Sequence, residues 1–455
     1  MDSFLSVERN VLVMSLTAFL MNFGAQAFQP FIPLYLDSLN ADVPQIGIVY
    51  VGIALATNLV SIPGGILADK VGRKAIIVIG NALGFGLFLL LLDVNTWTMA
   101  LIVLFAATAF ATLVQPAYSS SVAESVKVGE RSRAFGTFFA LVYLGLALGS
   151  VIGGRLSNSG KFELNIILIA TMGLSAAGLR MIFLRETLSR EATGTGSKPK
   201  ERFFVRRLSR NVWLVLAVLL LYNFAAGLGQ PLYALFSTKQ LSLSMGDFGV
   251  MVGAGYLAAM FGALGAGKVS KKLGVRRMMM FSVILSGGLL LPWLYAPNSL
   301  AAIGFFAISG FFAQFFFVGN QTLMANITKP KERASIIGLI TTIAGFGSIV
   351  APYIGTQVWI LLAPRTPFLI SSLLAVAVVA PIVLIREAHV KCPHCGRELP
   401  QEPRFCDMCG KPIVSKKCDA CGRDLGKEAR FCDACGRKQA ELALTETPSR
   451  EDRIP

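Results

Sequence analysis

The chain has 455 residues, of which 54% are hydrophobic and 15% are charged. Because soluble domains carry about 25% charged residues, this composition excludes an ordinary water-soluble protein. The formal net charge of +16 would suit a nucleic-acid-binding protein, but the placement of the basic residues, described below, indicates a membrane protein instead.

Long apolar runs follow one another from the N-terminus, and each predicts a membrane-spanning helix. About 20 apolar residues cross a bilayer as a helix, and a helix satisfies every backbone N–H and C=O within its own segment. The first run is too long for the core of a signal peptide, and no small-residue cleavage site follows it, so we interpret it as a retained span. The twelve predicted spans are 11–35, 45–67, 75–92, 97–120, 133–156, 164–184, 211–236, 247–267, 278–295, 299–325, 335–361 and 367–385.

The basic residues alternate between the two sides of these spans. Twenty-four Lys and Arg lie at the N-terminus, at the even-numbered junctions and just after the last span, whereas the odd-numbered junctions hold four: Arg155, Lys161, Lys239 and Arg365. Arg180 belongs to neither group, since it lies near a helix end. By the positive-inside rule we predict a multi-pass protein of the plasma (cytoplasmic) membrane with both termini in the cytoplasm.

An internal repeat relates the first six spans to the last six. Gly65–Lys74 reads GILADKVGRK between the second and third spans, and a related segment, Gly267–Arg276, reads GKVSKKLGVR between the eighth and ninth. Paired membrane units of this kind are how many transporters are built. We predict an all-α membrane protein, with twelve transmembrane helices as two six-helix repeats, followed by a small cytoplasmic domain that contains all the cysteines. The predicted domains are an N-terminal bundle (1–185), a cytoplasmic linker (186–210), a C-terminal bundle (211–388), a tandem cysteine domain (389–440) and a disordered tail (441–455).

The eight cysteines form four Cys-x-x-Cys pairs in two similar modules. A Cys-x-x-Cys turn lets two thiolates reach one metal ion, and four thiolates complete a closed tetrahedral zinc site. Disulfides are the alternative, but a cytoplasmic tail is reducing, and iron in a rubredoxin-like site is a further one. The tail resembles a double zinc ribbon, and we predict two structural Zn²⁺ ions. Their ligands would be Cys392, Cys395, Cys406 and Cys409 in the first site, and Cys418, Cys421, Cys432 and Cys435 in the second.

The charge of this tail bears on its partner. Residues 391–440 hold eleven Lys and Arg against seven Asp and Glu, and each four-thiolate zinc site adds about −2. The net charge is therefore close to zero, whereas a phosphate-binding module should be plainly basic. A contact with a cytosolic protein, or a spacer role, is favoured over nucleic-acid binding.

The repeated loop resembles the signature loop of the major facilitator superfamily, Gly-x-x-x-Asp-x-x-Gly-Arg-Lys, and the twelve-span plan agrees with that family. The resemblance implies that the loop Asp links the two halves on the cytoplasmic face and helps to hold the outward-open state. The gating residues it implies are Gly65, Asp69, Gly72, Arg73 and Lys74. A second family pattern in the fifth span reads Gly145-LALG-Ser150-VI-Gly153-Gly154, with Ser150 in place of Pro. These glycines suit either close helix packing or an antiport-specific role.

Polar side chains recur along one face of several spans, where lipid makes them costly. They lie on the first, fourth, seventh and tenth spans, which line the cavity in the resembled family, and Pro30, Pro116 and Pro231 interrupt three of these. Hydrogen bonds between helices are the alternative explanation for each amide. The predicted substrate-cavity residues are Asn22, Gln26, Gln29, Gln115, Asn223, Gln230, Tyr233, Gln314, Asn320 and Gln321.

No Asp, Glu or His lies deep within a predicted span, so we expect an uncharged cavity, which suits a neutral or hydrophobic solute. No nucleophile–base arrangement or open metal site indicates an enzyme. The function we expect is secondary transport of a small solute, similar to the drug and small-solute exporters of the family. The alternative is a transporter-derived receptor or scaffold that signals through its cytoplasmic ribbons.

Overall fold

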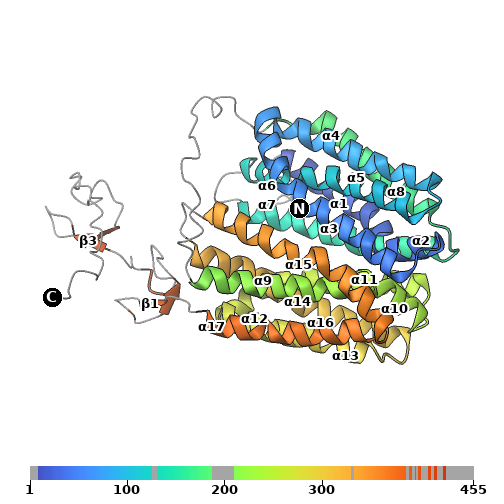
Figure 1. Ribbon diagram of the computed structural model, residues 1–455. Helices are drawn as coiled ribbons and strands as arrows, with labels where there is room; N and C mark the ends of the chain where they lie inside the picture. The colour runs from blue at the N-terminus through green and yellow to red at the C-terminus, as the bar shows by residue number, and fades with distance from the viewer. Residues whose placement is uncertain are drawn as a thin grey trace, which may run out of the picture. The chain divides into compact units, whose positions relative to one another are not determined.

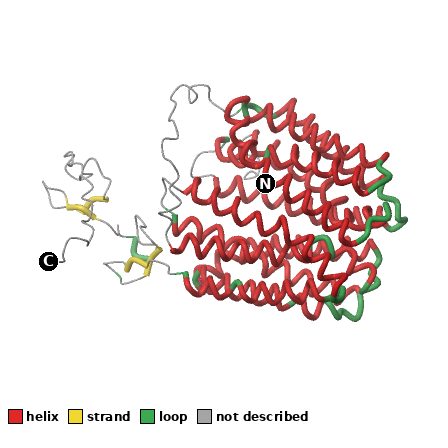
Figure 2. Tube along the Cα trace, viewed as in Figure 1, coloured by secondary structure: helices red, strands yellow, loops and turns green. Residues whose placement is uncertain are grey.

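The protein is described by a computed structural model that covers residues 9–125, 131–186, 210–328 and 333–385, together with 389–391, 395, 398–400, 408–410, 415–417 and 424–426. It divides into two compact units, Met1–Ile385 and Arg386–Pro455. The described part of the first unit is helical, and the strands belong to the second (Figure 2). Most of the predicted linker and the whole predicted disordered tail lie outside the described residues.

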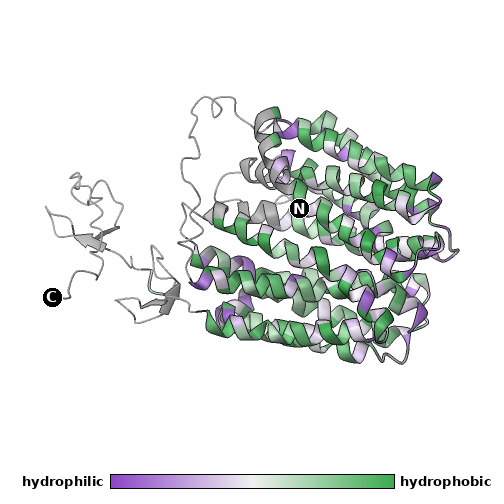
Figure 3. Cartoon of the chain, viewed as in Figure 1, coloured by the Kyte–Doolittle hydropathy of each residue, from purple (hydrophilic) through white to green (hydrophobic). Residues whose placement is uncertain are grey.

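Within the described ranges, twelve helical segments are long and apolar enough to cross a membrane, which confirms the predicted fold class. Apolar residues cover most of each helix, and hydrophilic residues gather at the helix ends (Figure 3). The first six segments are α1 (Arg9–Phe28) with η1 (Gln29–Phe31) and α2 (Ile32–Ser38), α3 (Val43–Val71), α4 (Arg73–Gly86) with η2 (Leu87–Asp93), α5 (Trp97–Leu113) with α6 (Gln115–Glu124), α7 (Arg131–Ser157) and α8 (Glu163–Phe183).

The second six segments repeat this plan. They are α9 (Arg210–Gly229) with α10 (Tyr233–Lys239), α11 (Met245–Leu273), α12 (Val275–Gly288) with α13 (Leu290–Trp293), α14 (Ser299–Ile327), α15 (Arg333–Leu361) and α16 (Thr366–Ala377) with α17 (Val379–Leu384). The helix breaks in the first, fourth and seventh spans fall at Pro30, Pro116 and Pro231, because proline removes a backbone donor and crowds the preceding turn.

Two pairs of helices form the boundary between the halves. Helix α7 lies along α11, and α3 lies along α15 (Figure 1). Glycines let the first pair meet backbone to backbone: a Cβ on Gly154 would lie 2.6 Å from the carbonyl oxygen of Met245 and 2.9 Å from Cα of Gly249. On the same helix, a Cβ on Gly145 would lie 2.6 Å from the carbonyl oxygen of Phe19 in α1. Close packing therefore accounts for these glycines of the fifth-span pattern.

The second unit contains two antiparallel hairpins. Strand β1 (His389–Lys391) pairs with β2 (Glu398–Pro400), and β3 (Ser415–Lys417) pairs with β4 (Asp424–Gly426). The chain between the strands of each hairpin holds one Cys-x-x-Cys pair. The first and third of the four pairs thus fall, along the sequence, between two paired strands.

Candidate functional site

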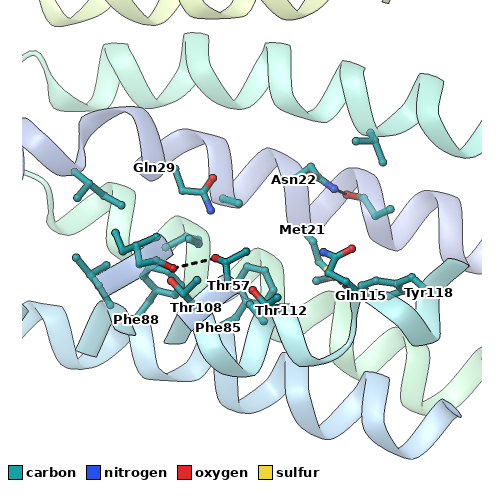
Figure 4. Close-up of a pocket in the computed structure, with 18 of the residues that line it drawn as sticks. Met21, Asn22, Gln29, Thr57, Phe85, Phe88, Thr108, Thr112, Gln115 and Tyr118 are labelled. Carbon is teal, nitrogen blue, oxygen red and sulfur yellow. Dashed lines mark hydrogen bonds between the residues drawn. The ribbon is translucent and has the colours of Figure 1, made fainter. Parts of the chain in front are cut away.

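A cavity of about 450 Å³ is lined mostly by the first six-helix group, with Gln230 contributed by the second. Most of its polar lining comes from the first, second and fourth spans, with Asn22 and Gln29 facing Thr57, Thr108 and Thr112 in Figure 4. Phe85 and Phe88 lie toward one end of the view, and Met21, Gln115 and Tyr118 toward the other (Figure 4). The volume and the mixture of aromatic, amide and hydroxyl groups are those of a small-molecule site.

Six of the predicted cavity residues line cavities, but they do not share a single one. Asn22, Gln29, Gln115 and Gln230 line the 450 Å³ cavity. Gln314 lines a second cavity of about 370 Å³ in the other half, and Tyr233 lines a third of about 230 Å³. The polar residues identified from the sequence are thus divided among three cavities.

Gln26 connects the two halves. Its Nε2 atom donates a hydrogen bond of 3.3 Å to the hydroxyl of Tyr256, which lines the 370 Å³ cavity together with Gln314. This contact lies at the boundary formed by α7 and α11 with their neighbours. Gln26 is therefore placed to respond to any change in the separation of the halves.

The remaining three predicted residues line none of these cavities. Asn223 donates to the backbone oxygen of Ala344 at 3.1 Å, which is a hydrogen bond between helices. Asn320 is 5% exposed, and its Oδ1 has no hydrogen-bond partner among the residues described. Gln321 is exposed. Hydrogen bonding between helices, the alternative explanation, accounts for Asn223.

Arg180, which is not among the predicted cavity residues, is fully buried and lines the 450 Å³ cavity. Its Nε donates to the hydroxyl of Thr17 at 2.7 Å, and Nη1 donates to the sulfur of Met21 at 2.9 Å and to the hydroxyl of Tyr118. The guanidinium carbon also lies 4.5 Å from the centre of the Tyr118 ring. The expectation of an uncharged cavity is therefore wrong.

A periodic signal for Arg180 was present in the sequence. The buried face of α8 runs through Ile166, Ile169, Gly173 and Ala177, and Arg180 continues it at helical spacing. The small residues Gly173 and Ala177 leave room on that face. Because it lies near a helix end, Arg180 was set aside from the count of basic residues, whereas the periodicity indicates an inward side chain.

The signature loop is anchored to the start of the interdomain linker. Gly72 adopts a φ of 109°, and the backbone N–H groups of Arg73 and Lys74, which open α4, donate to the carboxylate of Glu186 at 3.2 and 3.1 Å. A carboxylate is stabilised at a helix N-terminus by the free N–H groups and the helix dipole. The backbone of Gly65 and Asp69 lies in α3, and their side chains lie outside the described residues.

Two contacts link the halves at one end of the bundle. Lys239 and Asp37 form an ion pair of 2.6 Å between the ends of α10 and α2. The backbone N–H of Gly246 donates to Oδ1 of Asn158 at 2.8 Å, which adds a second link at the same end. This is the end that the distribution of basic residues predicts to be extracellular.

The cysteine tail offers donors that suit zinc. One Cys-x-x-Cys pair lies in the sequence between the paired strands of each hairpin, and Gly410, which follows Cys409, adopts a φ of 67° that would let the backbone turn around an ion. Cys395 and Cys409 are the two predicted ligands within the described segments, which contain no group of three or more metal-binding side chains. The remaining six predicted ligands lie outside those segments. Thiolate donors in paired turns are those that zinc prefers.

Comparison with known proteins finds a matching family model for each of the two units. The family model described as Major Facilitator Superfamily matches residues 14–245 and 218–397, and that described as Double zinc ribbon matches residues 392–436. The quinolone resistance protein NorA of Staphylococcus aureus (strain COL) is 22% identical over 353 residues, which cover 76% of this chain and 89% of that protein. An uncharacterized MFS-type transporter of Methanocaldococcus jannaschii is 27% identical over 207 residues, which cover 45% of this chain and 51% of that protein.

Solved structures share the fold of the first unit. The nucleoside transporter NupG superposes with a TM-score of 0.62 at 15% identity, covering 82% of this chain and 98% of that chain. A bacterial homolog of the human lysosomal transporter Spinster superposes with a TM-score of 0.61 at 14% identity, covering 82% and 94%. The chain therefore belongs to the major facilitator superfamily, with a double zinc ribbon at its C-terminal end.

Proposed function

We propose that this protein is a secondary active transporter that moves a small solute by alternating access. The observation that carries the proposal is the 450 Å³ cavity with polar and aromatic lining in a twelve-helix bundle, formed mostly by one half and completed by Gln230 of the other. Rocking of two such halves about a boundary would open a cavity to each side in turn. The protein is not an enzyme in this proposal, since binding and movement of the solute are the whole of its activity.

The contacts between the halves support one state of such a cycle. The Asp37–Lys239 ion pair and the Asn158–Gly246 hydrogen bond close one end. If both termini lie in the cytoplasm of a plasma-membrane protein, as we propose, this end would face outward, and the described conformation would be one closed to the outside. The cytoplasmic gate would then involve Asp69 and Arg73.

We propose export as the direction of transport. The relative named for quinolone resistance supports it, because resistance to a compound is expected from its removal from the cell. The aromatic side chains Phe85, Phe88, Phe138 and Phe139 in the lining favour a solute with an apolar or aromatic body. The prediction of a neutral or hydrophobic solute depended on an uncharged cavity lining. Because Arg180 lines the cavity, that prediction loses its support.

The zinc ribbons have a structural role in this proposal. Two Zn²⁺ ions, each held by four of the cysteines, would supply the folding energy of a unit too small to fold on a hydrophobic core. Closed four-thiolate sites leave no open position for a substrate. The ribbons would then contact a cytosolic protein or act as a spacer.

Exchange in liposomes tests the proposal. Purified protein is reconstituted with internal norfloxacin, a fluorescent quinolone, or with internal naphthaleneacetate, and entry of labelled external compound is followed against empty liposomes. Exchange of either compound that falls in Gln115→Ala and is unchanged in the surface variant Arg365→Met supports transport through the cavity. Binding of either compound without any exchange would contradict it and favour the receptor or scaffold alternative.

A further inference from the structure

Arg180 is a buried charge whose described partners are all neutral. Its guanidinium contacts the hydroxyl of Thr17, the sulfur of Met21, and the hydroxyl and ring of Tyr118. No carboxylate in the described ranges forms an ion pair with it. The positive charge therefore lacks a counter-charge in the surroundings that the structure describes.

The neighbours of Arg180 hold it in place without neutralising it. The Tyr118 oxygen accepts hydrogen bonds from the guanidinium and from Nδ2 of Asn81, the latter at 2.7 Å, and the Tyr118 hydroxyl donates to the sulfur of Met21 at 3.4 Å. With two bonds accepted and one donated, the hydrogen-bonding capacity of this hydroxyl is used. Thr17, Tyr118 and Arg180 come from α1, α6 and α8, so three helices fix the orientation of one guanidinium.

A charge kept in a membrane-spanning bundle without a counter-charge has a large desolvation penalty. Such intramembrane charges face bundle interiors or cavities and mark ligand pathways. Arg180 meets this description, because it lines the 450 Å³ cavity while it is fully buried from solvent. An anionic ligand would supply the missing charge, and a planar guanidinium can donate two parallel hydrogen bonds to a carboxylate.

We propose that Arg180 forms an anion subsite of this cavity, and that the transported solute carries a carboxylate attached to an aromatic or apolar body. The inference rests on the proposed transport function and specifies its substrate class. The carboxylate would bind at the Tyr118 end of the cavity, and the body would extend toward Phe85 and Phe88 at the other end (Figure 4). The same charge would repel cationic solutes of equal size.

Three probes that share one aromatic body and differ in the terminal group test this subsite. Naphthaleneacetate, naphthaleneethanol and naphthylethylamine are an anion, a neutral compound and a cation on one aromatic body. Binding to the purified full-length protein is measured as thermal stabilisation over a concentration series, since a ligand of the folded state raises the melting temperature. We expect the acid to bind tightest and the amine weakest.

Two arginine variants provide a matched comparison. In Arg180→Met the acid should bind about tenfold more weakly or worse, as expected for loss of charge-assisted hydrogen bonds, while the alcohol should bind as before. Arg365→Met removes another arginine that lies 4.5 Å from a tyrosine ring, that of Tyr295, but on an exposed loop, and it should leave all three affinities unchanged. If Arg180→Met does not fold, Arg180→Lys is used, which should keep the order of the probes with weaker binding of the acid.

The outcomes separate this inference from the proposed function. Equal binding of the acid and the alcohol to the wild-type protein, or an unchanged preference for the acid in Arg180→Met, would overturn the anion subsite. Exchange of norfloxacin in liposomes would still support transport in that case. Preference for the acid without exchange of any compound would overturn transport and leave the anion subsite standing.

Discussion

Nζ of Lys239 lies 2.6 Å from Oδ1 of Asp37, and this ion pair joins the two six-helix halves at one end of the bundle. The side chains are 50% and 39% exposed, so water and salt screen the pair. Exposed ion pairs contribute only about 0–1 kcal/mol. A link of this strength favours the closed end and still permits it to open.

Asp37→Asn should shift the population toward opening at this end and leave the melting temperature nearly unchanged, because one weak link is lost and no buried charge is created. The measurement is the distance between spin labels on the ends of α2 and α10, which should gain a longer component. The exchanged pair Asp37→Lys with Lys239→Asp should restore the wild-type distribution. An unchanged distribution in Asp37→Asn would show that the pair does not hold this end.

Gly154→Val should destabilise the protein by about 1–3 kcal/mol, because the added side chain would overpack the contact between α7 and α11. The measurement is the thermal unfolding of the purified protein. Gly178→Val is the control, since a Cβ there meets nothing within 4 Å. Equal effects of the two substitutions would indicate that the low helix propensity of valine, and not the contact between α7 and α11, determines the loss of stability.

Glu186→Gln should weaken the anchor of the signature loop by about 0.3–1 kcal/mol, the range for a carboxylate at a helix N-terminus. The amide keeps an acceptor oxygen but loses the charge that interacts with the free N–H groups of Arg73 and Lys74. Hydrogen exchange of the first turn of α4 is the measurement and should become faster. Glu163→Gln, at the start of α8, is the matched control and should leave exchange at α4 unchanged. Unchanged protection in Glu186→Gln would mean that the carboxylate is dispensable.

Elemental analysis of the purified protein should find about two zinc ions per chain, one for each set of four thiolates. Cys395→Ser should lower the content to about one, because three thiolates no longer close the site. The cavity variant Gln115→Ala should retain two. A content of one or none in the wild-type protein would contradict the assignment of the eight cysteines.

The membrane fold could be predicted because its signals are local. Twelve apolar runs define the spans, and Pro30, Pro116 and Pro231 fall where the structure breaks its helices. The double zinc ribbon could likewise be recognised, since the spacing of its cysteines is a property of short turns. The residue roles assigned to the cavity, the gate and the metal sites stay predictions.

The shape of the site depends on which helices pack against each other. The helical periodicity of the sequence does not determine this packing. The polar stripe of Gln314 and Gln321 on α14, with Asn320 adjacent, does not show which neighbouring helix each side chain faces, and Gln321 is exposed. For the same reason Asp37 and Lys239 could be counted as loop charges but not paired, since they lie in different halves. Arg180 was assigned by its distance from a helix end, whereas its contacts with Thr17 and Tyr118 depend on three helices together.

The glycine contact between α7 and α11 has a mechanical consequence. A Cβ on Gly253 would lie 2.7 Å from the carbonyl oxygen of Ala147, so the approach of backbones at Gly154 continues along the seam. Interlocked side chains must change rotamers before two helices can rotate past each other, whereas smooth backbone surfaces need no such step. Rotation of the halves relative to each other about the contact between α7 and α11 would therefore have a low energy barrier. Bulky residues at this contact would raise that barrier before they prevented folding.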